Sequence, residues 1–305
     1  MKAGTNLEKV LESGQFAITA EVGPPKGTTA KAVQTKGQAL KSYTDAVNVT
    51  DNQTAIVRMS SVAGCALLKQ IGVDPVMQIV CRDRNRIAIQ SDVLGAVALG
   101  IGNILCLTGD HQKLGNHPTA KGVFDLDSIQ LIAMLKKMRD EKKFLSGDPI
   151  SGDVPIFIGA AENPYAHPYE FRVQRLAKKV AAGADFIQTQ AVYDVARFTD
   201  WMKRIVDLGL DQRVHILAGI IPMKSAGMAR YMRDYVAGVH VPDILVTRME
   251  DAKDARQEGI NIMLEIIEQL KVMNGIKGIH IMAVGWEEIV PVIVEKAKLL
   301  PRPIL

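Results

Sequence analysis

The feature that most constrains the fold is an alternation that repeats eight times along the chain. Short apolar, β-branched runs alternate with longer segments of helical periodicity, which predicts parallel strands joined by right-handed helical crossovers. The predicted strands are residues 16–22, 45–50, 76–81, 103–108, 154–159, 185–190, 214–220 and 278–284. Helical segments lie between them, for example at 29–41, 86–99, 126–142, 168–182, 195–208, 225–235 and 253–274.

The count of eight strand–helix units favours a closed barrel over an open, doubly wound sheet. Periodicity alone does not separate the two, because both are buried parallel sheets with nearly continuous apolar strands. The length of 305 residues suits one barrel, for which roughly 250 residues is typical. The chain shows no linker, short repeat or low-complexity tract. We therefore predict an α/β fold with a single (β/α)8 TIM barrel spanning residues 1–305.

Charge and cysteine usage exclude several classes of protein. The 37 basic and 33 acidic residues give a net charge of +4 that is spread along the chain, so no nucleic-acid or membrane-binding surface is expected. There is no signal-peptide pattern and no apolar run near the ~20 residues that span a bilayer, which predicts a cytoplasmic protein. Cys65, Cys81 and Cys106 lie far apart in apolar stretches and are expected to be reduced core residues. His111 and His117 have no third ligand nearby, so no metal site is predicted.

Polar residues at the C-terminal ends of the predicted strands are the candidate site, because a barrel builds its active site at that end. Glu21, Thr50, Asp110 and Gln190 follow strands one, two, four and six. Glu21 has apolar neighbours, and a carboxyl in a partly desolvated pocket has a raised pKa and can serve as a general acid. Glu21 could instead be a helix cap or an ion-pair partner, Asp110 a turn residue after Gly109, and Gln190 a cap of neighbouring backbone.

Two basic segments are candidates for binding an anion. Residues 81–86 read Cys-Arg-Asp-Arg-Asn-Arg and suit an anionic or heteroaromatic group, the alternative being helix capping by Asp83 with solvated charge. Lys178 and Lys179 could reach a phosphate, although lysines on a helix are usually solvated. No dinucleotide fingerprint, P-loop or nucleophile elbow is present. The residues alone therefore indicate a barrel enzyme with an acid and an anion-binding rim.

Six segments, taken together in order and spacing, resemble the methylenetetrahydrofolate reductase family of flavin-dependent (β/α)8 barrels. They are Ala-Glu-Val-Gly-Pro-Pro at 20–25, Val-Asn-Val-Thr-Asp-Asn at 47–52, the segment 81–86, Leu-Cys-Leu-Thr-Gly-Asp at 105–110, Ala-Gly-Ala-Asp-Phe-Ile-Gln-Thr-Gln at 182–190, and Gly-Ile-Ile-Pro at 219–222. The resemblance covers essentially the whole chain.

This resemblance implies reduction of 5,10-methylenetetrahydrofolate to 5-methyltetrahydrofolate by hydride from the N5 of reduced flavin. Glu21 would be the general acid that opens the substrate ring to a 5-iminium ion, and Asp110 would stabilise the developing cation. Thr50 and Gln190 would hold the pterin. The implied cofactor is FAD, with FMN as an alternative. Its implied contacts are Gln78, Arg82, Asp83, Thr108, Gly109, Asp110, Phe124, Arg175, Lys178, Lys179 and Ala184.

Departures from the family pattern concern the source of electrons. Gln78 and Thr108 stand where many members have histidine and arginine. Ala226 replaces an aromatic residue that stacks with folate and nicotinamide, and residues 284–286 read Val-Gly-Trp instead of Leu-Asn-Arg. The expected donor is either NAD(P)H or a partner subunit with zinc and iron–sulfur centres, as in the anaerobic branch of the family. An oligomer is also expected.

Two other classes of function stay open at this point. Pterin-binding barrels that transfer the methyl group of methyltetrahydrofolate without a flavin also carry acidic and amide groups at their strand ends. The second open class is a non-catalytic barrel that binds folate or a partner protein. The combination of Glu21, Asp110 and Gln190 argues against such a scaffold, because a scaffold has no need of a buried acid.

Overall fold

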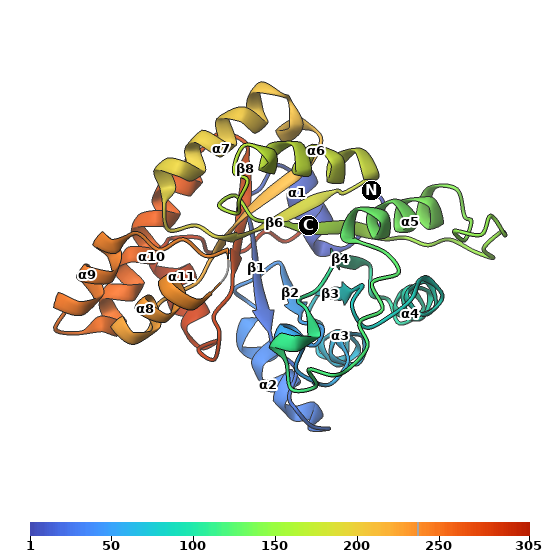
Figure 1. Ribbon diagram of the computed structural model, residues 1–305, viewed down its shortest axis with the longest axis horizontal. Coiled ribbons are helices and arrows are strands. Elements are labelled where there is room, and N and C mark those ends of the chain that lie inside the picture. The colour runs from blue at the N-terminus through green and yellow to red at the C-terminus, as the bar shows by residue number, and fades with distance from the viewer. Residues whose placement is uncertain (237) are drawn as a thin grey trace.

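A computed structural model describes residues 1–236 and 238–305, and its centre is a closed barrel of eight parallel strands (Figure 1). Each strand is hydrogen-bonded to the next, and β8 closes the barrel against β1, which confirms the predicted (β/α)8 fold. The strands are β1 Ala17–Val22, β2 Ala46–Val49, β3 Pro75–Val80, β4 Asn103–Leu107, β5 Phe157–Glu162, β6 Phe186–Ala191, β7 His215–Ile220 and β8 Ile276–Ile281.

Helices surround the barrel, and α8 to α11 gather on one side of it (Figure 1). The helices are α1 Asn6–Glu12, α2 Ala30–Leu40, α3 Ser61–Gln70, α4 Arg86–Ala98, α5 Ser128–Asp140, α6 Phe171–Ala182, α7 Val195–Asp207, α8 Ala226–Tyr235, α9 Asp243–Asp251, α10 Ala255–Lys271 and α11 Ile289–Lys296. Three short 3-10 turns are η1 Gln53–Ala55, η2 Gln112–Leu114 and η3 Leu210–Gln212. None of the helices in the described part of the chain has the length and apolar character needed to cross a bilayer.

Two strands, β5 and β8, differ from their predicted bounds by more than one residue. β5 begins at Phe157 and not at 154, because Pro155 has no N–H for the ladder and the Phe157 N–H makes the first bond, to Gly102 O at 2.8 Å. β8 ends at Ile281, because the Val284 N–H turns back to Met282 O at 3.1 Å. Four helices, α1, α3, α9 and α11, lie outside the predicted helical ranges.

Alternate strand residues face two different cores. One set packs under the surrounding helices, and the other points into the barrel. The inward residues near the strand starts join α1 in a separate cluster, which we call the apolar floor. Its members are Leu7, Val10, Leu11, Ala17, Ala46, Val76, Leu105, Phe157, Phe186 and Leu217. Because α1 contributes three of these side chains, it closes the barrel at the N-terminal ends of the strands.

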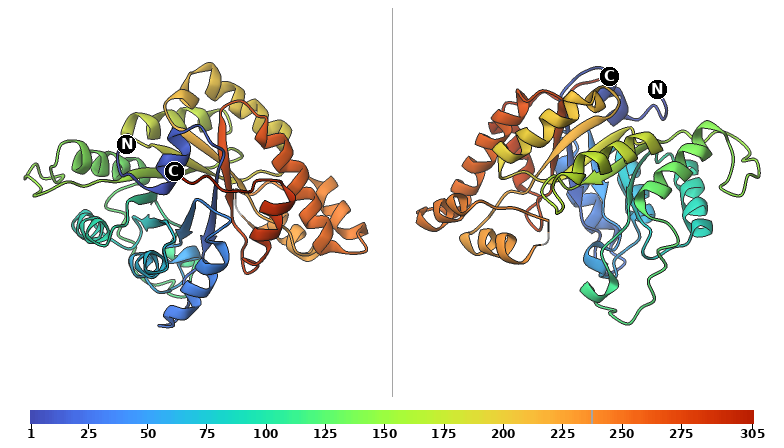
Figure 2. Two further views of the ribbon diagram at one scale, coloured as in Figure 1. Left: turned by 180° about the vertical axis from the view of Figure 1, so that it is seen from behind. Right: turned by 45° about the horizontal axis from the view of Figure 1, so that its top comes forward.

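Both ends of the chain are fixed at this closed end (Figure 2). Lys2 forms an ion pair with Asp185, which directly precedes β6. Arg302 pairs with Asp45, which directly precedes β2. The open end of the barrel is therefore left to the loops that follow the strands.

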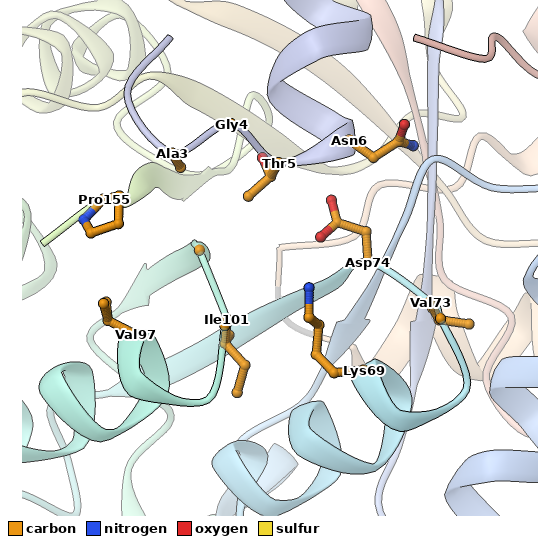
Figure 3. Close-up of a pocket in the computed structure, with 13 residues that line it drawn as sticks. Ala3, Gly4, Thr5, Asn6, Lys69, Val73, Asp74, Val97, Ile101 and Pro155 are labelled. Carbon is orange, nitrogen blue, oxygen red and sulfur yellow. The ribbon is translucent and has the colours of Figure 1, made fainter.

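A cavity of about 350 Å³ also lies at the closed end, between the N-terminal segment and the loops that precede β3 and β4 (Figure 3). Lys69 extends toward Asp74 there (Figure 3). The Asp74 carboxylate accepts hydrogen bonds from the Leu7 backbone N–H at 3.2 Å and from Asn103 Nδ2 at 3.1 Å. This carboxylate therefore anchors the start of α1, and none of the predicted site residues lines the cavity.

Replacement of Gly159 tests the packing of the apolar floor. A Cβ at Gly159 would lie 2.2 Å from the Phe186 ring, which itself stacks on Phe157 with centroids 5.2 Å apart. Gly159→Ala should lower the free energy of unfolding by roughly 1–3 kcal/mol, measured by urea denaturation. Gly95→Ala is the matched control, because its Cβ would meet open space on α4, and it should stabilise by up to ~1 kcal/mol. Equal effects of the two changes would contradict this packing.

Candidate active site

A layer of hydrogen-bonded polar side chains crosses the barrel interior. The amides of Asn48 on β2 and Gln188 on β6 bond to each other, with Nδ2–Oε1 at 2.6 Å and Nε2–Oδ1 at 3.1 Å. Gln188 Nε2 also donates to Thr19 Oγ1 at 3.0 Å. Because β2 and β6 are not neighbours in the sheet, this contact spans the interior. All three side chains are buried, so the network satisfies polar groups that would be costly to leave unpaired.

His280 on β8 connects this layer to the candidate acid. Its Nδ1 lies 2.9 Å from Thr19 Oγ1, and its Nε2 lies 3.9 Å from Glu21 Oε2. Burial lowers the pKa of His280 to about 3, so the ring is neutral at pH 7. His280 therefore gives Glu21 no positive charge that would favour its ionised form.

Glu21 on β1 is a nearly buried carboxyl that has no cationic partner within residues 1–236 and 238–305. Its side chain is 13% exposed and accepts one hydrogen bond, from Gln78 Nε2 on β3 at 3.1 Å. Burial raises the pKa of Glu21 to about 7, the Gln78 hydrogen bond opposes the rise, and the charge of Glu287 adds to it. A group that is partly protonated near neutral pH is suited to general acid catalysis.

Glu21 lines a cavity of about 300 Å³ at the C-terminal ends of the strands, near the lower end of the ~300–1,000 Å³ that is typical of ligand pockets. Five of the residues predicted from the sequence line it together: Glu21, Gln78, Arg175, Lys179 and Gln190. The structure thus brings together residues from β1, β3, β6 and α6 in one cavity.

A bulge in β6 positions Gln190 on the cavity wall. The pairing of β6 with β7 shifts register between Gln188 and Ala191, and Gly219 N donates to Thr189 Oγ1 at 2.9 Å within the irregular stretch. A Cβ at Gly219 would lie 2.1 Å from Thr189 O, so only glycine allows this approach. Bulges commonly redirect a side chain beside an active site, and this one brings Gln190 into the cavity.

Helix α6 provides a cationic wall, which we define as Arg172, Arg175 and Lys179. Their spacing of three and four residues puts them on one helix face, and all three line the cavity. Lys179 is 4% exposed and its Nζ donates to Glu162 Oε2 at 2.7 Å. Burial lowers the pKa of Lys179, and the charge of Glu162 opposes that effect. Since Glu162 neutralises only one cation, the two arginines leave positive charge for an anionic ligand such as a phosphate.

Comparisons with known proteins identify the family of this chain. A sequence profile described as methylenetetrahydrofolate reductase matches residues 6–298. The chain belongs to the methylenetetrahydrofolate reductase family. The 5,10-methylenetetrahydrofolate reductase of Salmonella typhimurium is 25% identical over 281 residues, which cover 88% of this chain and 86% of that protein.

Other members of the comparison are either longer than this chain or less similar to it in sequence. Methylenetetrahydrofolate reductase 2 of Saccharomyces cerevisiae is 28% identical over 243 residues, which cover 76% of this chain but only 38% of the yeast protein. A solved structure of an uncharacterized protein from Clostridium thermocellum, which binds two copies of 5-methyl-5,6,7,8-tetrahydrofolic acid, has a TM-score of 0.65 at 13% identity. That match covers 97% of this chain and 100% of the other, and it supports the barrel fold.

Not all residues that the reductase family resemblance implied lie in this cavity. Arg82 and Asp83 bond to each other in a two-fold ion pair, with Nε–Oδ1 at 2.8 Å and Nη2–Oδ2 at 2.7 Å. Arg82 also donates to the backbone carbonyls of Asp110 at 3.1 Å and Asn52 at 3.2 Å. These contacts tie together the loops after β2, β3 and β4, and they use the donors that an anionic ligand would need.

The other arginines of the segment 81–86 are paired in the same way. Arg84 Nη1 lies 2.6 Å from Asp51 Oδ2, and Arg86 Nε lies 2.8 Å from Asp125 Oδ2. The α4 N-cap is Asn85, whose side chain accepts from two backbone N–H groups at 3.1 Å, so the capping alternative that named Asp83 was wrong. Protein carboxylates therefore satisfy this segment, and no residue of it lines the cavity.

The predicted residues around β4 shape its rim. Thr108 Oγ1 accepts from the Ser128 backbone N–H at 3.1 Å at the start of α5. Gly109 has a φ of +92° and packs against Val80, and the Asp110 side chain is exposed. Phe124 is 37% exposed, and its backbone N–H bonds to Cys81 O at 3.2 Å. These side chains stand beside the cavity and not on its wall.

Three further predicted residues also lie apart from the cavity wall. Thr50 is buried, and its Oγ1 has no hydrogen-bond partner among residues 1–236 and 238–305. Lys178 is exposed, with its Nζ 5.5 Å from the centre of the Phe171 ring. Ala184 is buried just before β6, at the closed end of the barrel.

Sequence reasoning missed the polar layer, His280 and Arg172. A usable signal existed, because inward strand positions recur every second residue. Thr19, Asn48 and Gln188 each stand two residues before a predicted rim residue, namely Glu21, Thr50 and Gln190.

The three cysteines are free and buried, as expected. Within the described residues, no group of three or more metal-type ligands gathers.

The burial of Glu21 predicts how stability changes with pH. Its folded-state pKa of about 7 lies above the ordinary 4.5, so the stability due to its neutral form is complete below pH 4.5 and is lost as pH rises through 7. Glu21→Gln removes this loss. Its free energy of unfolding should exceed that of the parent by up to roughly 3 kcal/mol above pH 7 and should match it below pH 4.5, measured by urea denaturation. The exposed Glu141→Gln is the control, and a difference that did not vary with pH would refute the expectation.

Proposed function

We propose that this chain is a flavin-dependent reductase that converts 5,10-methylenetetrahydrofolate to 5-methyltetrahydrofolate, with Glu21 as the general acid. The observation that carries the proposal is the presence of a carboxyl that is partly protonated near pH 7 and of a cationic wall in one cavity at the open end of the barrel. Family membership supports the same reaction, because the Salmonella relative bears the name of this enzyme.

Glu21 supplies the proton that this reduction requires. The five-membered ring of the substrate opens when the bond between the one-carbon unit and N10 breaks and its electron pair goes to N10. Transfer of the Glu21 proton toward N10 leaves a 5-iminium cation that can accept hydride. Gln78 and His280, the partners of the acid, are neutral, so burial is not offset by a cation and a substantial fraction of Glu21 is protonated near pH 7.

The other polar groups would orient the substrate. Gln190 on the cavity wall is proposed to bond the pterin, which has amide-like donors and acceptors, and Thr50 is proposed to assist it. Asp110, in the loop after β4, is proposed to stabilise the iminium cation through its carboxylate. The pterin-binding Clostridium barrel with the same fold is compatible with a folate substrate.

The cationic wall would hold the flavin phosphates. Arg172 and Arg175 have donors suited to phosphate oxygens, and Lys179, paired with Glu162, completes the wall beside them. FAD is the proposed cofactor, with FMN as the alternative, and in reduced form it supplies the hydride from N5. Gln78, Thr108, Gly109 and Phe124 remain proposed contacts of its ring system.

We further propose that a partner subunit delivers the electrons. Ala226 at the start of α8 has no ring to stack with nicotinamide. Trp286 is 5% exposed and covered by the Arg256 guanidinium at 5.3 Å, so it does not replace that ring. Apolar side chains at the open end, Val57 and Leu114, are 55% and 65% exposed and suit a docking surface.

Flavin binding is tested with two variants on the same helix. Arg175→Ala should weaken FAD affinity roughly 10-fold to 100-fold, because it removes a charge-assisted contact from the cavity wall. Lys178→Ala is the matched control, since that lysine is exposed and lies outside the cavity, and it should leave affinity unchanged. Quenching of flavin fluorescence on titration gives the affinities. Absence of any FAD or FMN binding would favour the flavin-free methyltransferase.

The same flavin-loaded protein tests the electron donor. Dithionite should bleach the flavin absorbance and NADH should not, because the nicotinamide contacts are lost. Rapid bleaching by NADH would overturn the proposal that a partner subunit delivers the electrons, and it would leave the proposed reductase function intact.

The acid is tested by single-turnover oxidation of the reduced, flavin-loaded protein with methylenetetrahydrofolate. Glu21→Gln should slow this reaction roughly 100-fold to 10,000-fold, since the amide cannot give up a proton. Flavin affinity should stay the same, and the exposed Glu141→Gln should react at the parental rate. A Glu21→Gln protein that reacts as fast as the parent would refute the proposed function.

A further inference from the structure

Glu21 faces a second cavity on the other side of its carboxyl. This cavity measures about 250 Å³ and lies toward α2 and the loop after β8, whereas the first lies toward β3–β6 and α6. Besides Glu21, its polar lining consists of Lys36, Gln53, Arg58 and Glu287. Glu21 is the only one of the residues lining the first cavity that also lines this one.

One residue on the wall of this second cavity, Arg58, has a buried nitrogen without a partner among residues 1–236 and 238–305. Arg58 donates through Nη1 to Pro24 O at 2.9 Å, but its Nε has no acceptor among the described residues. The Thr50 hydroxyl, which also has no partner among the described residues, lies behind this wall, 4.0 Å from the position that a Gly23 Cβ would take, and does not itself line the cavity. Polar cavities with such unsatisfied groups are where proteins hold ordered water. The second cavity is therefore suited to water and not to an apolar ligand.

A pair of opposite charges stands on the wall of this cavity. Lys36 Nζ bonds to Glu287 Oε1, and the two side chains are 38% and 15% exposed. The negative charge of Glu287 disfavours ionised Glu21, and Lys36 offsets part of that charge. Lys36 therefore lies closer to solvent than Glu21, which is 13% exposed, and Glu287 is buried to about the same degree as Glu21.

We propose that the second cavity is a water-filled path through which Glu21 regains a proton from solvent, and that Glu287 and Lys36 are positioning residues that set the charge along it. This inference rests on the proposed function, in which Glu21 is the acid. It adds a route and two residues that the reaction itself does not specify.

The proton balance of the reaction supports such a path. Each turnover moves one proton from the Glu21 carboxyl to N10, and the carboxylate must then take one proton from water before the next turnover. Ligands in the first cavity cover the side of Glu21 from which the proton leaves. A separate path lets water reach the other side while those ligands are bound.

The charge effect is tested by a pair of variants with opposite expected results. Three sets of polar groups surround Glu21. Inside the barrel these are Gln78 and the neutral His280, and across the first cavity they are the Lys179–Glu162 pair, Arg172 and Arg175. At the second cavity they are Arg58, Lys36 and Glu287. Glu287→Gln leaves Lys36 unpaired and should lower the titration midpoint of Glu21. Lys36→Met leaves Glu287 unpaired and should raise it, each by roughly half a pH unit.

The midpoint is read by infrared or carbon-13 NMR titration of the glutamate carboxyls, with the Glu21→Gln protein identifying the Glu21 signal. This measurement needs no activity. A merely structural pair would move both midpoints in the same direction or not at all, and either result would overturn the charge assignment. The proposed reductase function would still stand, because its own test is the single-turnover rate of Glu21→Gln.

The path itself is tested by filling the cavity. Gly23→Val puts a larger side chain on the cavity wall, where a Cβ alone would meet Gln53 Oε1 at an unstrained 3.9 Å. In the flavin-loaded enzyme with dithionite as the electron donor, Gly23→Val should lower kcat several-fold while the single-turnover rate changes less, because only later turnovers need a new proton. Gly23→Ala should show a smaller effect of the same kind. Equal losses in kcat and single-turnover rate in both variants would overturn the path.

Discussion

The amide pair between Asn48 and Gln188 is the contact on which the barrel interior depends. It joins two strands that are not neighbours and holds Thr19 through a second bond of Gln188. Any one of these groups left unpaired would cost about 1–3 kcal/mol at such depth. Because Thr19 in turn occupies Nδ1 of His280, only Nε2 of that ring faces Glu21. The layer thus separates the apolar floor from the reactive carboxyl and fixes what that carboxyl meets.

Two glutamates in the same cavity differ in their surroundings and therefore in their chemistry. Glu162 lies against the Lys179 ammonium at 2.7 Å, which holds it as a structural counter-ion. Glu21 meets a neutral amide and a neutral imidazole, and its pKa rises to about 7. Separation of carboxyl roles by environment is a recurrent way to run acid chemistry near neutral pH. The position of the one lysine decides which glutamate can act as the acid.

The sequence predicted the barrel, and five residues that it singled out line one cavity, because the eight-fold alternation and the strand-end polar residues are local patterns. It could not predict which charges neutralise each other. Arg84 meets Asp51 from another loop, and Arg82 turns to its own neighbour, Asp83, so a segment that looked like an anion site is satisfied internally. His280 escaped notice because β8 was expected to continue to residue 284, which put His280 in the middle of the strand and not near its C-terminal end. Gln190 enters the cavity through a bulge that no periodicity reveals.

The attachment of both chain ends beside the apolar floor has a consequence for how this barrel can be joined to other proteins. The ends are held by Asp185 and Asp45, on the side away from Glu21. An affinity tag or a fused domain at either end would leave the molecule from its closed side, so substrate would still reach the open side freely. Gene fusion can thus lengthen such a chain without rebuilding its site, and the yeast relative, of which this chain spans 38%, is an example of a longer member.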